Sequence, residues 1–235
     1  MSRRSILLTL TLACTLSRAA HAAAPPTLTT LEARYHAHLL AARPDLAAHA
    51  GLGGEDRLEP ITEATLTRDA AWVRAFMTDL HRLDAAQLGA RSRVRADSLR
   101  ERVARENAAL ASGLWHREPR AYLALVHAAV LEVGLAPRIS ACERERRAML
   151  RLRMVPEVLR AALVNLRDTH ALAPADDAAF QAAALDLRTK LLARLEDCKD
   201  PRRQADVIEA DSLALKAYAS FLADLRAFPA VERAR

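Results

Sequence analysis

Residues 62–83, TEATLTRDAAWVRAFMTDLHRL, decide the fold class of this chain. One side of the segment carries apolar side chains at steps of 7, 3, 4 and 3 residues, namely Leu66, Val73, Phe76, Leu80 and Leu83. This spacing places all five on one face of an α-helix. Thr62 stands directly before the run, where a hydroxyl can accept a hydrogen bond from a free backbone amide of the first turn. The segment therefore predicts an amphipathic helix that packs against other helices.

The same signals recur along the chain, and no segment shows the period-two alternation of a half-buried strand. Capping residues or prolines that suit the first turn of a helix stand at Thr29, Thr62, Ser92, Pro119, Pro137, Pro156, Pro174 and Pro201. Between the helices that begin at Thr29 and Thr62, the sequence predicts a short helix over 45–50 and a glycine-rich loop over 51–60. The sequence thus predicts an all-α fold, an antiparallel array of about seven long helices with no sheet.

Composition agrees with that expectation. Among 235 residues, 51% are hydrophobic, 27% are charged, 4% are aromatic and only 6 are glycine. The apolar fraction is sufficient for a core and excludes global disorder. Few glycines and aromatic residues argue against a β-sandwich or barrel. The length fits a single helical domain over residues 23–235, after the N-terminal segment described next.

Residues 1–22 have the pattern of a secretory signal peptide. Arg3 and Arg4 precede an apolar run, and Ala20 and Ala22 supply small residues at the −3 and −1 positions of a cleavage site before Ala23. The run is shorter than the roughly 20 residues of a membrane-spanning helix, so no membrane span is expected after processing. The protein is expected to be exported, most simply to the periplasm. A general secretory signal and a twin-arginine signal remain alternatives.

Processing also changes the charge of the protein. Loss of Arg3, Arg4 and Arg18 reduces the formal net charge from +6 to +3. The remaining arginines alternate with acidic residues, as in residues 143–147, ERERR. Mixed charge of this kind is typical of a solvated helix face, whereas nucleic-acid binding requires a basic stripe, so no nucleic-acid partner is expected.

Two cysteines, Cys142 and Cys198, remain after processing, and both fall in segments expected to be helical. An exported protein can join them in a disulfide. Two separate buried thiols are the equally acceptable alternative.

The titratable residues do not form a catalytic or metal motif. No pair of histidines has the H-E-x-x-H spacing of a zinc peptidase. Glu32 and His36 are four residues apart and could hold a metal together, but an ordinary surface contact is the preferred interpretation. His127 is expected to be a core histidine with a satisfied hydrogen bond. Asp97 and Asp211 are either acid–base candidates with raised pKa or partners of arginines, and the second interpretation is preferred. No catalytic, cofactor-binding or metal residue is assigned, and no cofactor is expected.

Several short stretches, in order along the chain, carry a resemblance to a known family. They are AARPDLAAHAGL (41–52) followed by Asp56-Arg57-Leu58, LDAAQL (83–88) with Arg93 and Asp97, EPRAYL (118–123), VPEVL (155–159) with Asn165-Leu166, and AYASFL (217–222). Together they resemble the bacterial proteins catalogued as domain of unknown function 885. Glu118 departs from the pattern, since that family usually has asparagine before Pro119.

The resemblance implies an exported, helical protein similar to gluzincin peptidases of the carboxypeptidase Taq type. The zinc ligands of those proteins lie in a C-terminal half, and no position of this sequence matches them. We therefore expect a homologue of the N-terminal half that is not catalytic by itself and that binds a peptide or a partner protein. One alternative is half of a split zinc metallopeptidase completed by a separate catalytic chain. Another is a small metal-free helical enzyme.

Overall fold

The computed structural model describes residues 26–43, 56–133, 140–166, 174–195 and 198–228. Within these ranges it contains helices and no strands, which confirms the all-α prediction. Seven helices are long: α1 (Leu28–Ala42), α3 (Glu63–His81), α4 (Ala90–Ala111), α6 (Pro119–Val133), α7 (Ala141–Asn165), α8 (Pro174–Leu195) and α9 (Pro201–Arg226). A 3-10 turn, η1 (Ala85–Gln87), and a four-residue helix, α5 (Leu114–Arg117), complete the described elements.

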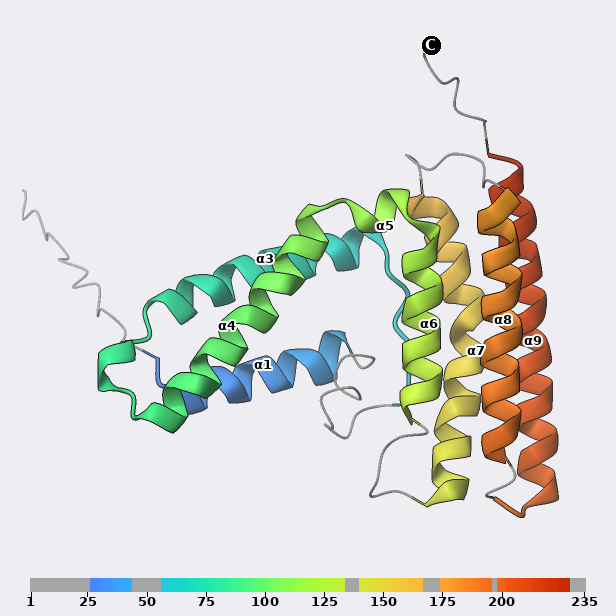
Figure 1. Ribbon diagram of the computed structural model, residues 1–235, viewed down its shortest axis with the longest axis horizontal. Helices are drawn as coiled ribbons and strands as arrows, with labels where there is room; N and C mark the ends of the chain where they lie inside the picture. The colour runs from blue at the N-terminus through green and yellow to red at the C-terminus, as the bar shows by residue number, and fades with distance from the viewer. Residues whose placement is uncertain (1–25, 44–55, 134–139, 167–173, 196–197, 229–235) are drawn as a thin grey trace, which may run out of the picture.

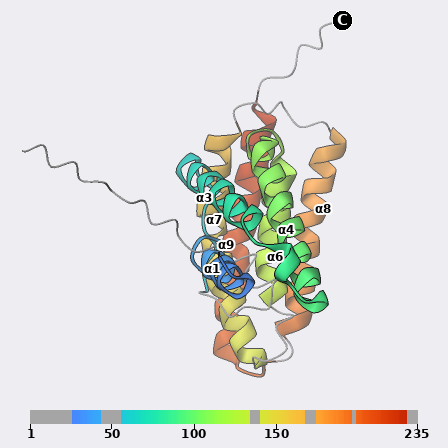
Figure 2. The ribbon, with the colours of Figure 1, turned by 90° about the vertical axis from the view of Figure 1, so that its left-hand side faces the viewer.

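The helices form two groups, which we call the arm and the bundle. The arm consists of α1, α3 and α4 and projects sideways from the bundle of α6, α7, α8 and α9 (Figure 1). Viewed along the arm, its three helices lie in front of the bundle (Figure 2). Consecutive bundle helices run in opposite directions, as expected for short connections, and α7 and α9 share the most extensive contact.

Each group has its own apolar core. The arm core joins one face of each arm helix and includes Leu31, Phe76 and Val103, none of which is exposed by more than 1%. The bundle core includes Leu152, Leu159 and Phe221. Leu58 and Ile61, from the segment that precedes α3, are also buried in the bundle core, so this segment anchors the arm to the bundle.

A buried hydrogen-bond network fixes the same junction. Asn165 on α7 donates to the backbone carbonyl of Ile61 at 2.6 Å and to the Tyr122 hydroxyl at 3.0 Å. The Tyr122 hydroxyl donates to the carbonyl of Trp115 on α5 at 2.8 Å. The segment that precedes α3 and the helix α5, which joins α4 to α6, therefore both bond to one polar pair between α6 and α7.

Several helix ends lie where the sequence placed them. Thr62 caps α3 and forms a reciprocal capping box with Thr65. Asp200 caps α9, and Pro201 occupies its first turn. Two predictions were wrong by a few residues: α1 is capped by Thr27 instead of Thr29, and α4 begins after Gly89 instead of Ser92. Each time an earlier residue already had the extended backbone that a cap requires.

Pro156 does not begin a new helix, contrary to expectation, because α7 continues through it from Ala141 to Asn165. A proline inside a helix removes one backbone hydrogen bond and costs about 3 kcal/mol. Buried apolar side chains stand on both sides of it, including Leu152, Val155, Val158 and Leu159. Burial of each contributes about 1.5–3 kcal/mol, so the packing against neighbouring helices exceeds the cost of the proline.

Cys142 and Cys198 form a disulfide, with their Cα atoms 4.8 Å apart. Cys142 lies in the first turn of α7, whereas Cys198 precedes α9 outside any helix, which corrects the helical expectation for that residue. The backbone amide of Cys198 also donates to the buried carboxylate of Glu145 at 3.1 Å. The start of α9 is thus held to the start of α7 by a covalent bond and a hydrogen bond.

Some predictions fall outside the described residues. They include the signal peptide with its cleavage residues Ala20, Ala22 and Ala23, the short helix over 45–50, and the start of a helix at Pro137. Within the described ranges, the structure has no helix with the length and apolar character needed to cross a membrane.

Candidate functional site

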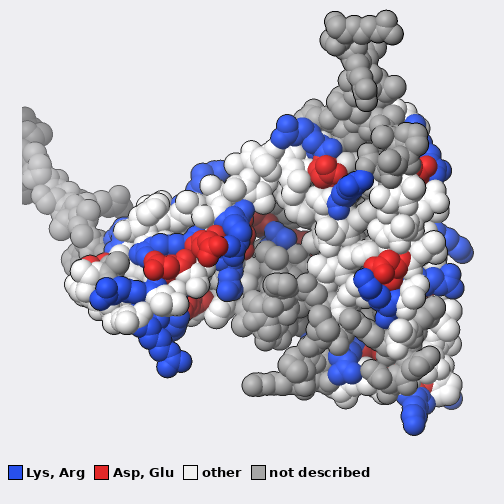
Figure 3. All heavy atoms as spheres, in the orientation of Figure 1, with Lys and Arg blue, Asp and Glu red and all other residues white. Residues whose placement is uncertain are grey.

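A cavity lies in the arm, on the side near the bundle, and we call it the arm cleft. Its volume is about 690 Å³. Its walls come from α1, α3, α4 and α5: Tyr35, His38, Leu39, Arg43, Asp69, Val73, Arg102, Arg105, Glu106, Ala109, Leu110 and Trp115. A hollow where the arm meets the bundle, with basic and acidic atoms near its edge, is visible in the space-filling view (Figure 3). A volume of this size can accept a segment of a few residues or a small molecule.

Aromatic rings support one wall of the arm cleft. His38 stacks on Trp72 with ring centroids 3.6 Å apart and planes 6° apart, and Trp72 stacks in turn on Phe76 at 4.7 Å. Burial, together with the nearby charges of Arg43 and Arg68, lowers the pKa of His38 to about 4. His38 is therefore neutral at pH 7 and contributes an aromatic face and a polar atom, but no charge.

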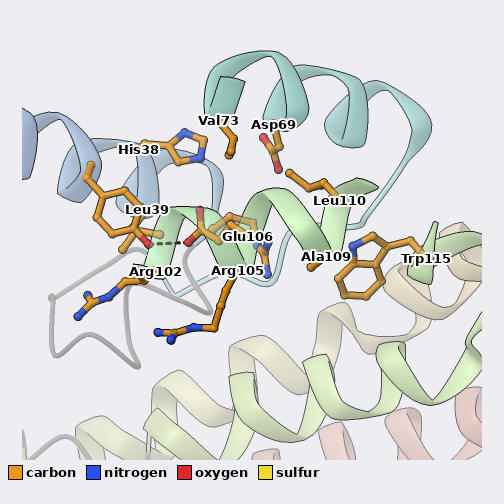
Figure 4. Close-up of a pocket in the computed structure, with 12 residues that line it drawn as sticks. His38, Leu39, Asp69, Val73, Arg102, Arg105, Glu106, Ala109, Leu110 and Trp115 are labelled. Atoms are coloured by element: carbon orange, nitrogen blue, oxygen red, sulfur yellow. Dashed lines mark hydrogen bonds between the residues drawn. The ribbon is translucent and has the colours of Figure 1, made fainter. Parts of the chain in front are cut away.

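The two carboxylates of the arm cleft already have donors from the protein. The hydroxyl of Tyr35 on α1 donates to Glu106 on α4 at 2.5 Å (Figure 4). Burial and the adjacent Glu106 carboxylate raise the pKa of Tyr35 well above its usual value, so the hydroxyl stays protonated. Asp69 on α3 accepts from Arg68 at 3.1 Å. These contacts fix the position of both acidic groups.

Three arginines also line the arm cleft, and they differ in how they are engaged. Arg102 and Arg105 extend from α4 on the side facing away from α3 (Figure 4). Arg105 pairs with Glu101 at 2.6 Å. Arg43 lies at the end of α1, close enough to affect the pKa of both Tyr35 and His38. Arg102 forms no ion pair within the described part of the chain, so its guanidinium has unused donors.

Glu32, considered above together with His36, has an arginine partner. Its carboxylate forms an ion pair with Arg95 of α4, which links two helices of the arm. In the described ranges, no group of three or more histidine, cysteine or acidic side chains is arranged to hold a metal ion.

Asp97 and Asp211 have arginine partners, as preferred from the sequence. Asp97 is exposed and pairs with Arg100 at 2.9 Å. Asp211 is 3% exposed and lies 3.5 Å from Arg188, which joins α9 to α8. Burial still raises the pKa of Asp211 above its ordinary value. Neither carboxylate lines the arm cleft.

His127 lies outside the arm cleft, in a smaller depression of about 240 Å³ between α6 and α8. Burial lowers its pKa, and a hydrogen bond with the backbone of Ala183 opposes that shift. Its Nε2 atom is buried and has no hydrogen-bond partner among the described residues. The expectation of a core histidine with a satisfied hydrogen bond is therefore correct for only one ring nitrogen.

Sequence reasoning missed most of the arm cleft. The sequence predicted no site role for five of its lining residues, namely Tyr35, Leu39, Arg102, Arg105 and Glu106. One available signal was the interruption of the α4 stripe between Val103 and Leu110, where the buried face gives way to half-buried polar residues. That change marks the stretch of α4 that lines the arm cleft.

Comparison with known proteins identifies the family but no activity. None of the curated proteins compared matches this chain. A solved structure described as a "putative lipoprotein of unknown function from Shewanella oneidensis" has the same fold, with a TM-score of 0.64 and 17% sequence identity. The similarity covers 86% of this chain and 37% of that one, so this chain spans little more than a third of the neighbour's length. The family model described as a bacterial protein of unknown function, DUF885, matches residues 44–234, and the chain belongs to this family.

Proposed function

We propose that this chain is an exported, periplasmic, non-catalytic binding protein that corresponds to the N-terminal region of a peptidase-like family and holds a peptide in the arm cleft. The observation that carries the proposal is the arm cleft itself, a cavity of about 690 Å³ with charged, aromatic and apolar walls. Peptides offer the same mixture of groups, since their backbone is polar and their side chains alternate in character.

The composition of the walls favours binding over chemistry. A catalytic centre requires an activated nucleophile or a general base within reach of a reacting group. His38 is neutral but stacked against Trp72, and both acidic groups of the cleft already accept hydrogen bonds from the protein. These groups are positioned to shape a surface that recognises a ligand.

A fluorescence titration tests this function. The chain has two tryptophans, Trp72 and Trp115, and only Trp115 lines the arm cleft. In the variant Trp72→Phe, Trp115 is the sole reporter, and a panel of short peptides of mixed sequence should change its emission in a saturable way. Ala109→Phe, which fills the arm cleft, should abolish the response. Ala108→Phe, at an exposed neighbouring position outside the lining, should retain it. Equal responses in both alanine variants would contradict binding in the cleft.

One half of a split zinc metallopeptidase is the second candidate. The similarity covers 37% of the solved neighbour, and the family resemblance places the zinc ligands of such proteins in a C-terminal half. Under this proposal a separate chain of gluzincin type supplies the H-E-x-x-H motif, and this chain forms part of the substrate cleft. The test is coexpression with the product of an adjacent reading frame that encodes such a motif. A stable complex with one bound zinc and peptidase activity would support it, and the absence of any such frame would exclude it.

A further inference from the structure

Three buried hydrogen bonds connect the interior of the bundle to a wall of the arm cleft. The amide nitrogen of Asn165 donates to the carbonyl of Ile61 at 2.6 Å and to the hydroxyl of Tyr122 at 3.0 Å. Tyr122 donates in turn to the carbonyl of Trp115 at 2.8 Å. Asn165 and Tyr122 are 1% and 0% exposed, and of these four residues only Trp115 lines the arm cleft.

The direction of each bond follows from what the groups can donate. A backbone carbonyl only accepts, so the Tyr122 hydroxyl must donate to Trp115 and accept from Asn165. The amide nitrogen of Asn165 has two N–H groups, and each has one of the two acceptors. An apolar side chain of similar size has no donor, so it would remove the bond to the Ile61 carbonyl and the bond to Tyr122 together.

Tyr122 holds Trp115 in two ways. Its hydroxyl bonds to the backbone carbonyl of Trp115, and its ring meets the indole edge to face, with centroids 5.1 Å apart and planes 66° apart. Trp115 lies in α5, which has only four residues and therefore few backbone hydrogen bonds of its own. The position of this wall of the cleft thus depends on Tyr122.

Asn165 also fixes the beginning of α3, which forms another wall of the arm cleft. Ile61 is buried in the bundle core and directly precedes Thr62, the cap of α3. Asp69 and Val73, further along α3, line the arm cleft (Figure 4). Because α3 is one continuous helix, a displacement of its first turn moves these two residues as well.

We propose that Asn165 and Tyr122 are positioning residues for peptide binding, which hold Trp115 and the start of α3 in place for a peptide that neither residue touches. This inference rests on the proposed function, since it names residues that set the affinity of the same cleft. Without these bonds the indole occupies its binding position for only part of the time, and the affinity falls in proportion to that fraction.

The fluorescence of Trp115 tests the first step without any peptide. In the Trp72→Phe protein, the further change Tyr122→Phe should shift the Trp115 emission to longer wavelength and increase its quenching by acrylamide, because the indole is released toward water. Tyr218→Phe is the matched control, because Tyr218 is also buried in the bundle and its hydroxyl has no hydrogen-bond partner among the described residues. This control should change neither the emission nor the quenching.

A second control separates positioning from a general loss of stability. Val207 is 1% exposed and lies in the second turn of α9, which begins at the end of the bundle away from α5 (Figure 1). Val207→Ala removes buried methyl groups there and lowers stability, but it should leave the emission and quenching of Trp115 unchanged.

Peptide affinity tests the second step, measured by isothermal calorimetry so that it does not depend on the Trp115 signal. Short peptides should bind the Tyr122→Phe protein about three- to tenfold more weakly than either control, since one neutral hydrogen bond corresponds to a factor of that size. Asn165→Leu should weaken binding in the same way, and it replaces Tyr122→Phe if that variant does not fold. The two changes combined should weaken binding by less than the product of their separate effects, because both act through one chain of bonds.

Several results would contradict this role of Tyr122 and Asn165. Equal emission and quenching in the Tyr122→Phe and Tyr218→Phe proteins would show that Tyr122 does not hold the indole. Equal peptide affinity in all variants would show that these residues do not set the affinity, while peptide binding in the cleft stands. An equal loss of affinity in Val207→Ala would make the effect one of general stability. If no peptide binds even the Trp72→Phe protein, the proposed function fails and this inference fails with it.

Discussion

Burial determines the protonation state of individual residues in the arm cleft. Burial is the main reason that the Tyr35 hydroxyl stays protonated and that the His38 ring stays neutral at pH 7, since it raises the pKa of Tyr35 and lowers the pKa of His38 to about 4. These two groups therefore keep a constant charge across the neutral range. Acidification is the condition expected to disturb it, through His38.

The substitution His38→Phe should remove part of the acid sensitivity of the fold. His38 has a pKa of about 4 in the folded chain against about 6.5 when unfolded, so only the unfolded chain gains its proton between those values. His38 therefore leaves the free energy of unfolding unchanged above pH 6.5. As the pH falls from 6.5 toward 4, this residue lowers that free energy by at most about 3 kcal/mol.

Phenylalanine keeps the stack on Trp72 but does not titrate. Chemical unfolding at a series of pH values should show a smaller loss of stability below pH 6.5 in the variant than in the unmodified protein. The other acid-sensitive groups, such as Asp211, titrate in both proteins and cancel in the comparison. Parallel pH profiles would show that burial of His38 does not affect stability.

Two buried tyrosines provide a second test at the residue scale. The Tyr122 hydroxyl connects Trp115 and Asn165 at the junction of arm and bundle, so Tyr122→Phe should reduce the free energy of unfolding by about 1–3 kcal/mol. The Tyr218 hydroxyl is buried and has no hydrogen-bond partner among the described residues. Tyr218→Phe should therefore be neutral or stabilising. Urea unfolding of both variants measures the contrast, and equal losses would contradict this account of the junction.

At the scale of single elements, the sequence predicts the helices well and their ends less well. Apolar stripes locate α3 and α9 because periodicity reports burial directly. Thr62 as a cap and Pro201 as a first-turn residue were predicted correctly because the chain offers one suitable residue at each place. The start of α1 was missed because Thr27, Thr29 and Thr30 compete, and their side chains are chemically alike. The prediction that a new helix begins at Pro156 was wrong because local propensity favours a break there, whereas tertiary packing on both sides maintains the helix.

The arm cleft could not be predicted from the sequence in the same way. Its residues come from four elements, and the contact between Tyr35 and Glu106 spans 71 positions in sequence. Periodicity identifies which face of a helix is buried but not which helix it meets. By contrast, the family motifs proved informative about structure. Leu58, Tyr122 and Asn165, which carried the resemblance, all lie at the junction of arm and bundle.

The disulfide makes a prediction at the element scale. Cys142 and Cys198 are 56 residues apart, and closing a loop of that length in the unfolded chain stabilises the folded state by about 4 kcal/mol. Replacing both by alanine should lower the stability by up to that amount. A reducing agent should have a similar effect on the unmodified protein and none on the double variant. If reduction leaves the stability unchanged, the link between α7 and the start of α9 is not needed for stability.

For the whole molecule, the arrangement of arm and bundle explains why the cleft exists. The arm has a core of its own and meets the bundle mainly through residues 58–61, α5 and the Asn165–Tyr122 network. In the described part of the chain, the C-terminal part of α4 and the end of α1 line the arm cleft beside this junction. The arm cleft therefore lies where two separately packed groups of helices meet.

The central claim is that the arm cleft binds a peptide, and hydrogen–deuterium exchange of the intact chain tests it most directly. With a saturating peptide, slower exchange is predicted in α1 near residues 35–43 and in the segment 102–115, with little change in α8 and α9. Ala109→Phe should remove this protection while Ala108→Phe keeps it. Protection confined to the bundle, or unchanged exchange throughout at peptide concentrations that saturate the Trp115 signal, would contradict the account.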